Sequence, residues 1–98
     1  MAFIQTIEMK TTKIDDLRAL EKEWRAATEG KRTLRRSIIC QDRNDPDRYL
    51  VLAFFDSYES AMQNSQLPAT AEFAQRQSKL AATEPVFGDF DVIEEHDD

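Results

Sequence analysis

One segment of the chain, residues 48–56, limits the possible folds more than any other. It reads RYLVLAFFD, and its β-branched and aromatic residues are typical of a strand. Side chains of a strand alternate between two faces. From position 49 to 55, one face carries Tyr, Val, Ala and Phe, and the other carries Leu, Leu and Phe. A sheet with one face in water alternates apolar with polar residues, so this segment predicts a sheet that is covered on both sides.

Alternating patterns elsewhere in the chain predict three more strands. The four predicted strands cover residues 2–10, 33–42, 48–56 and 86–95. The turn-forming sequence RNDPD separates the second strand from the third, and the two are therefore expected to form an antiparallel hairpin.

Apolar residues at steps of three and four predict a helix over residues 13–29. Its apolar stripe consists of Ile14, Leu17, Leu20, Trp24 and Ala27. Thr12 is the expected N-terminal cap of this helix. A second helix is predicted from its cap, Ser57, to about residue 82, and Pro68 interrupts it and suits the first turn of its continuation.

The predicted order of elements is strand, helix, strand, strand, helix, strand. This is the βαββαβ order of the ferredoxin-like α+β fold, here in one domain over residues 1–98. Right-handed crossovers place both helices on one face of a four-stranded antiparallel sheet. The other face needs a cover because the third strand is apolar on it, and a second copy of the same sheet is the simplest one. The sequence therefore predicts a homodimer.

Charge and cysteine content restrict the partners and the compartment. The net charge of −6 repels phosphate backbones and anionic membranes, so neither nucleic acid nor a membrane is an expected partner. The basic stretch KRTLRR is interpreted as a solvated turn and strand start. With Cys40 as the single cysteine, no intrachain disulfide can form. The N-terminus also lacks the features of a signal peptide, and the cytoplasm is the expected location.

Metal and phosphate sites have little support in the sequence. The turn carries Asp42, Asn44, Asp45 and Asp47, a set that resembles a calcium loop. It lacks the spaced glycine and the terminal glutamate of such a loop, so a solvated turn is the preferred interpretation. A glycine-rich phosphate loop is excluded because Gly30 and Gly88 are the only glycines.

Several residues together point to a known family. They are the segment from Tyr49 to Ser57, then Glu59, Ala61, Asn64, Pro68 and Phe73, and the terminal strand sequence FDVI. With these features nearly the whole chain resembles the antibiotic-biosynthesis-monooxygenase group of the dimeric α+β barrel superfamily. The resemblance implies two ferredoxin-like sheets paired into a barrel with the helices outside. It also implies cofactor-independent oxidation of aromatic or quinone-like molecules, or haem degradation in one branch, although many members have no assigned reaction.

The chain departs from this family at ionisable positions. Members often carry a carboxylate where this chain has Ala53, a histidine where it has Asn64, and one or two histidines where it has Ala69 and Thr70. The single histidine, His96, lies in the acidic tail. Haem degradation needs an axial histidine from a helix, so that branch is disfavoured and no cofactor is expected. The usual acid–base group near neutral pH is also missing.

Two candidate site residues lie in the predicted helices. Trp24 is on the apolar stripe of the first helix, where it either packs in the core or forms the wall of a pocket between helix and sheet. Asn64 either polarises a substrate oxygen or orients dioxygen, as the resemblance implies, or caps the helix before Pro68. Core packing and capping are the commoner roles.

Two further candidates lie in strands. Arg36 either binds an anionic or phenolate substrate or pairs with Glu8 or Asp89 across the sheet, and the ion pair is the commoner outcome. Tyr49 either donates a hydrogen bond to a ligand or is an amphipathic residue at the rim. Cys40 is interpreted as a buried, small apolar group.

Two functions therefore remain open. One is a cofactor-free oxygenase or isomerase that acts on a small aromatic or quinone-like molecule. The other is a non-catalytic dimeric module that binds a ligand or regulates. A ligand-sized cavity with convergent polar groups favours binding or catalysis, whereas a space filled by side chains favours a structural role.

Overall fold

The computed structural model describes residues 2–98 and confirms the predicted order of elements. The elements are β1 (Phe3–Lys10), α1 (Ile14–Ala27), β2 (Arg36–Gln41), β3 (Arg48–Phe55), α2 (Tyr58–Ser65), α3 (Pro68–Leu80) and β4 (Val86–Asp91). The break predicted at Pro68 divides the second helix into α2 and α3, and the proline takes the first turn of α3. β2 and β4 are shorter than predicted.

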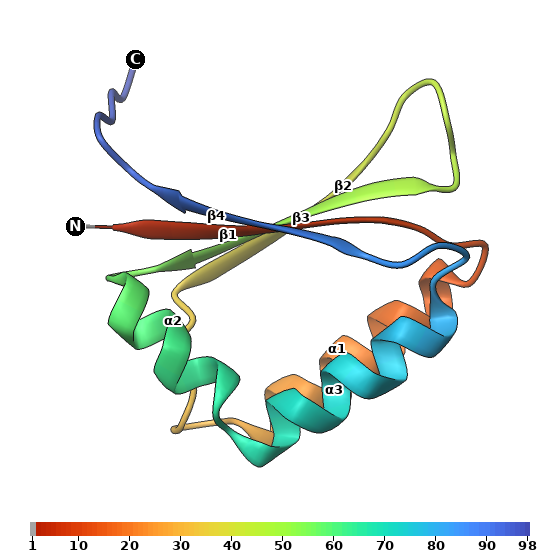
Figure 1. The fold of residues 1–98 in the computed structure, drawn as a ribbon, viewed down its shortest axis with the longest axis horizontal. Coiled ribbons are helices and arrows are strands. Elements are labelled where there is room, and N and C mark those ends of the chain that lie inside the picture. Colours follow the sequence, from red (N-terminus) through yellow and green to blue (C-terminus); the bar gives the residue numbers. More distant parts are fainter. Residues whose placement is uncertain (1) are drawn as a thin grey trace.

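The four strands form one antiparallel sheet in the order β2-β3-β1-β4. All three helices lie on the same side of this sheet, and α1 runs beside α3 (Figure 1). The predicted ferredoxin-like architecture with helices on one face is thus confirmed.

The strand register decides which side chains meet the helices. Phe3 lies opposite Phe55 and Met9 lies opposite Tyr49, and all four are buried on the side of the sheet that carries the helices. The alternate residues of each strand point the other way, to a surface called the open face below. Its apolar members are Ile4, Ile38, Leu50, Leu52, Phe54, Val86 and Phe90. β3 is apolar on both faces, as its sequence predicted.

Hydroxyl groups secure the ends of the helices. The prediction that Thr12 caps α1 is wrong, because α1 has no side-chain cap and the neighbouring Thr11 has the structural role. The buried Thr11 hydroxyl accepts the backbone N–H of the residue before α1 (2.9 Å) and donates to the carbonyl of Leu80 (2.7 Å). It therefore joins the start of α1 to the end of α3. α2 begins with a capping box in which Ser57 and Ser60 each accept the other's backbone N–H at 3.1 Å.

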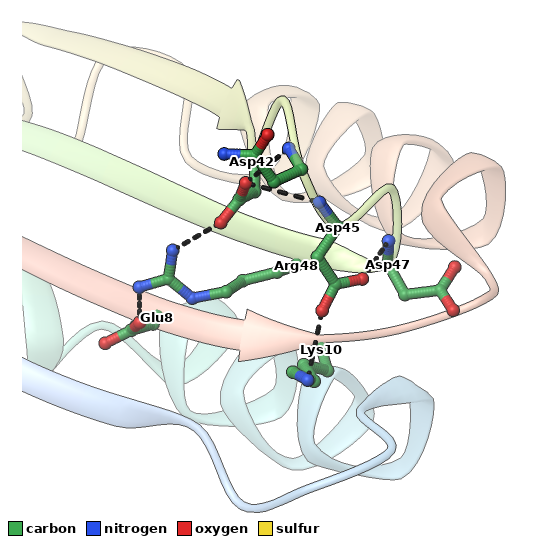
Figure 2. A network of polar contacts seen from close by, with 7 residues as sticks. Glu8, Lys10, Asp42, Asp45, Asp47 and Arg48 are labelled. Atoms are coloured by element: carbon green, nitrogen blue, oxygen red, sulfur yellow. Dashed lines mark hydrogen bonds and ion pairs between the residues drawn. The ribbon is translucent and has the colours of Figure 1, made fainter.

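Charged side chains fix the β2–β3 hairpin (Figure 2). Arg48 lies between Asp42, at 2.7 Å, and Glu8, and Lys10 pairs with Asp45 at 3.0 Å. The Oδ1 atom of Asp42 also accepts two backbone N–H groups of the turn. Within residues 2–98, no group of three or more His, Cys, Asp or Glu side chains has an arrangement that could hold a metal ion.

Acid is expected to weaken this hairpin. The backbone N–H of Asn44 and the guanidinium of Arg48 lower the pKa of Asp42. A carboxyl whose pKa is lower in the folded state stabilises the fold above its unfolded pKa, about 3.9, and this contribution is lost as the pH falls through the folded pKa. We expect the difference in urea midpoint between wild type and Asp42→Asn to shrink from pH 6 to pH 3. The Asp97→Asn change in the tail is the control, and a difference that does not vary with pH would contradict the prediction.

Candidate functional site

A cavity of about 250 Å³ lies between the helices and the sheet. All four strands and all three helices contribute to its walls, which are mostly apolar. Small side chains keep the space open, and those that line it are Ser37, Ala53, Ser65, Ala71 and Ala74. The space that the sequence left undecided between filled and empty is therefore open and ligand-sized.

Trp24 forms one wall of the cavity. Its side chain is buried, and its ring centroid lies 6.2 Å from that of Phe73, which also lines the cavity. The indole N–H donates to the hydroxyl of Thr70 at 2.9 Å, so α1 holds the ring in a fixed orientation against α3. Both interpretations of Trp24 thus apply, because the ring packs in the core and borders the empty space.

Asn64 brings an unpaired polar group to the cavity. Its side chain is 7% exposed and lines the space at the end of α2. Among the residues that the structure describes, its Oδ1 has no hydrogen-bond partner. The helix-capping interpretation is not supported, since only the backbone carbonyl of Asn64 accepts a hydrogen bond, at 3.3 Å from the N–H of Leu67. A buried amide oxygen without a partner costs about 1–3 kcal/mol.

Arg36 lies on the open face, on the other side of the sheet from the cavity. Its guanidinium sits 5.5 Å from the ring centroid of Phe54, its neighbour across β3. The ion pair predicted for Arg36 is wrong: Glu8 pairs with Arg48, and Asp89 faces the helices. The structure therefore separates Arg36 from Trp24 and Asn64.

Tyr49 faces the helices but lies outside the cavity lining. It is a buried core residue that packs with Leu17 and Met9, and its hydroxyl accepts a hydrogen bond from Gln41 at 3.3 Å. Tyr49 also lines a surface groove between α1 and β2, which agrees with the rim position predicted for it. Cys40 is partly exposed on the open face instead of buried.

Sequence reasoning missed Glu21 as a member of the site. Of the described residues that line the cavity, Glu21 is the one with a titratable side chain. It lies four residues after Leu17 and three before Trp24, so helical spacing places it on the flank of the apolar stripe. That spacing was the signal in the sequence. The amides of Gln5 and Gln77 also line the cavity.

Comparison with known proteins shows the fold and little else. No family model matches the sequence, and no curated protein matches it. The cofactor-independent oxygenase SnoaB from Streptomyces nogalater superposes with a TM-score of 0.79 and 10% identity, over 96% of this chain and 95% of that chain. The chain has the fold of the antibiotic biosynthesis monooxygenases. This outcome confirms the resemblance seen in the sequence as a likeness of structure.

Two further structures support the same conclusion. A protein of Chloroflexus aurantiacus, provisionally named an antibiotic biosynthesis monooxygenase, matches with a TM-score of 0.74 and 20% identity over 99% of this chain and 98% of that chain. One of Caulobacter crescentus, provisionally named likewise, matches with a TM-score of 0.80 and 12% identity over 95% of this chain and 91% of that chain. Identities this low establish the shared fold and leave the chemistry to the site.

The departures from the family pattern meet at the cavity. Ala53, Asn64 and Thr70 occupy positions where ionisable side chains were expected from the resemblance, and all three line the space. Ala69 lies instead in a separate depression between α1 and α3. The cavity is accordingly apolar, with neutral polar groups and one carboxylate. No helix of the described chain has the length and apolar character needed to cross a membrane.

Proposed function

We propose that the cavity binds a small aromatic hydroxy compound and promotes its oxidation by dioxygen without a cofactor. The observation that carries this proposal is the buried Asn64 amide, whose Oδ1 has no partner in an otherwise apolar space. A ligand hydroxyl supplies the missing hydrogen bond after a small rotation of the amide about its broad terminal torsion. The 250 Å³ volume exceeds the roughly 150 Å³ cavity that accepts benzene.

The lining suits an aromatic ring. Trp24 and Phe73 present aromatic surfaces to the space, and aromatic pairs gain about 0.5–1.5 kcal/mol beyond the burial of their area. A flat ring against these walls would direct its hydroxyl toward one of the few polar groups present. The shape of the cavity therefore favours an aromatic ring, and Asn64 favours a ring that carries a hydroxyl group.

The chemistry requires a proton acceptor and the exclusion of water. An activated ring CH2 group loses a proton to the Glu21 carboxylate, and the resulting carbanion transfers electrons to dioxygen as a carbon–oxygen bond forms. Glu21 returns its proton to the peroxide anion that results, and the hydroperoxide then eliminates water and leaves a ketone, so one oxygen atom enters the product and the other leaves as water. Dioxygen is the oxidant. The apolar walls exclude solvent from the charged intermediate, while Asn64 Oδ1 accepts a hydrogen bond from the ring hydroxyl.

Oxidation of an anthrone tests this function. We expect the protein to accelerate conversion of 2-hydroxyanthrone, which carries a hydroxyl for Asn64, to 2-hydroxyanthraquinone by about 10²-fold over buffer, the low end for a positioned proton acceptor. Glu21→Gln should lose most of this acceleration, whereas Glu23→Gln, a change on the same helix outside the cavity, should retain it. Absorbance of the product and consumption of dioxygen are the measurements. Oxidation no faster than in buffer would contradict the proposal.

A non-catalytic binding module is the second candidate. The observation that favours it is the lining, whose described residues offer one carboxylate and no histidine for proton transfer. In that case the single tryptophan, Trp24, provides the assay. Its indole N–H signal in a proton–nitrogen spectrum should shift when a naphthol enters the cavity, although the anthrone is not turned over.

We further propose that a second copy of the chain covers the open face. This face exposes Val86 at 61% and Phe90 at 56%, and the apolar side of β3 lies beside them across β1. Gly88 lies between these two residues, where a Cβ atom would come within 2.7 Å of the Phe90 ring. A contiguous apolar surface of this kind is a liability when left in water. Two identical sheets cover each other with a single two-fold axis.

A further inference from the structure

A surface groove adjoins the cavity at the edge of the sheet. The groove has a volume of about 560 Å³ and shares Glu21, Ser37 and Ile39 with the cavity. These three residues belong to the facing sides of α1 and β2. A ligand that enters between α1 and β2 therefore passes the groove first, and a ligand longer than the cavity leaves its outer end there.

Arg25 stands at the junction of the two spaces. Its Nη2 donates to the Ser37 hydroxyl at 2.6 Å, and the same nitrogen lies 3.3 Å from the carboxylate of Glu21. The side chain is 41% exposed and lines the groove. A guanidinium has five N–H donors, so Arg25 can keep its contact with Glu21 and still donate to a ligand.

The charge of the groove is opposite to that of the whole chain. Arg18 and Arg25 line it together with one carboxylate, Glu21, whereas the chain carries a net charge of −6. No carboxylate within residues 2–98 forms an ion pair with Arg18. The mouth of the cavity thus has a positive excess and a cation free to take an anionic partner.

We propose that the groove selects ligands that carry a carboxylate on the aromatic body held in the cavity. This inference rests on the proposed function, since it assigns the substrate class of the same site. Asn64 binds the hydroxyl at the inner end, and Arg18 and Arg25 bind the carboxylate at the mouth. Charge-assisted hydrogen bonds from arginine to a carboxylate are about twice as strong as neutral ones.

A purely structural role for Arg25 makes a different prediction. If the arginine only ties α1 to β2 through Ser37, its removal changes the stability of the fold and weakens acidic and neutral ligands equally. If it binds the ligand, its removal changes the ratio of the two affinities. The ratio of the affinities for the acidic and the neutral ligand therefore distinguishes a structural role of Arg25 from a binding role.

The test compares 6-hydroxy-2-naphthoic acid with its methyl ester, with the Trp24 indole N–H signal as the report of occupancy. We expect the acid to bind about tenfold more tightly than the ester. The Arg18→Gln/Arg25→Gln double variant should bring the two affinities together. Arg25→Lys should keep part of the preference because it keeps the charge. Arg43→Gln, in the β2–β3 turn outside both spaces, should leave the ratio unchanged.

The outcomes separate this inference from the proposed function. Equal binding of acid and ester by the wild type, or an unchanged ratio in the double variant, overturns the carboxylate-selecting mouth and leaves the aromatic site intact. A signal that neither compound shifts overturns both. A preference that falls as salt rises and disappears in the double variant supports the inference.

Discussion

We expect Asn64→Leu to be more stable than the wild type by about 1 kcal/mol and to lose its affinity for naphthols. The substitution replaces an amide, whose buried Oδ1 has no partner, with an apolar side chain of similar size. The desolvation cost of that oxygen, about 1–3 kcal/mol, is then removed. The same change deletes the group that binds the ligand hydroxyl. A gain in stability coupled to a loss of binding is typical of a residue kept for function.

Urea unfolding and the Trp24 indole signal measure the two effects separately. Asn64→Ala is the companion variant, because it removes the amide but enlarges the cavity and should destabilise the fold. Both variants should lose at least tenfold in affinity for 2-naphthol, the magnitude of one hydrogen bond to a buried group. If Asn64→Leu binds 2-naphthol as tightly as the wild type does, the amide is not the recognition group. If it is less stable than the wild type, the amide has a structural partner.

The sequence predicted the fold because the fold depends on periodic features. The two apolar faces of residues 48–56, the stripe from Ile14 to Trp24 and the break at Pro68 are all local patterns of spacing, and the structure has each of them. The ends of the shorter elements were less predictable. Thr12 was expected to cap α1 from its position alone, and α1 has no side-chain cap. A long-range contact with Leu80 instead gives Thr11 the structural role.

The site was only partly predictable, because strand parity does not say which face meets the helices. Arg36 shares a face with Ile38, and that fact is visible in the sequence. The register that sets Arg36 opposite Phe54, on the open face, depends on the geometry of the hairpin. The existence of the cavity also depends on the volumes of the side chains that surround it. Ala53 and Ala74 count as apolar in any pattern, yet their small size is what leaves the space empty.

Leu52→Glu is expected to convert the proposed dimer to single chains. Leu52 lies at the centre of the open face, opposite Ile38 on β2 and Thr6 on β1. In a sheet-to-sheet dimer the sheet of the second copy buries this position. An unpaired carboxylate there loses its hydration. We expect the dissociation constant of the dimer to rise by about two orders of magnitude, which corresponds to roughly 3 kcal/mol. The isolated chain should remain folded because the face is then in water.

Light scattering at micromolar concentration measures the effect, and circular dichroism verifies that the variant is folded. Ala26→Glu, an exposed change on the outer side of α1, introduces the same charge away from the sheet and should leave the mass at two chains. A wild type with the mass of one chain would contradict the dimer directly. A Leu52→Glu variant that remains dimeric would show instead that the copies meet through another surface. The apolar open face of β3 would then need a different partner, because its side chains at positions 50, 52 and 54 point away from the helices.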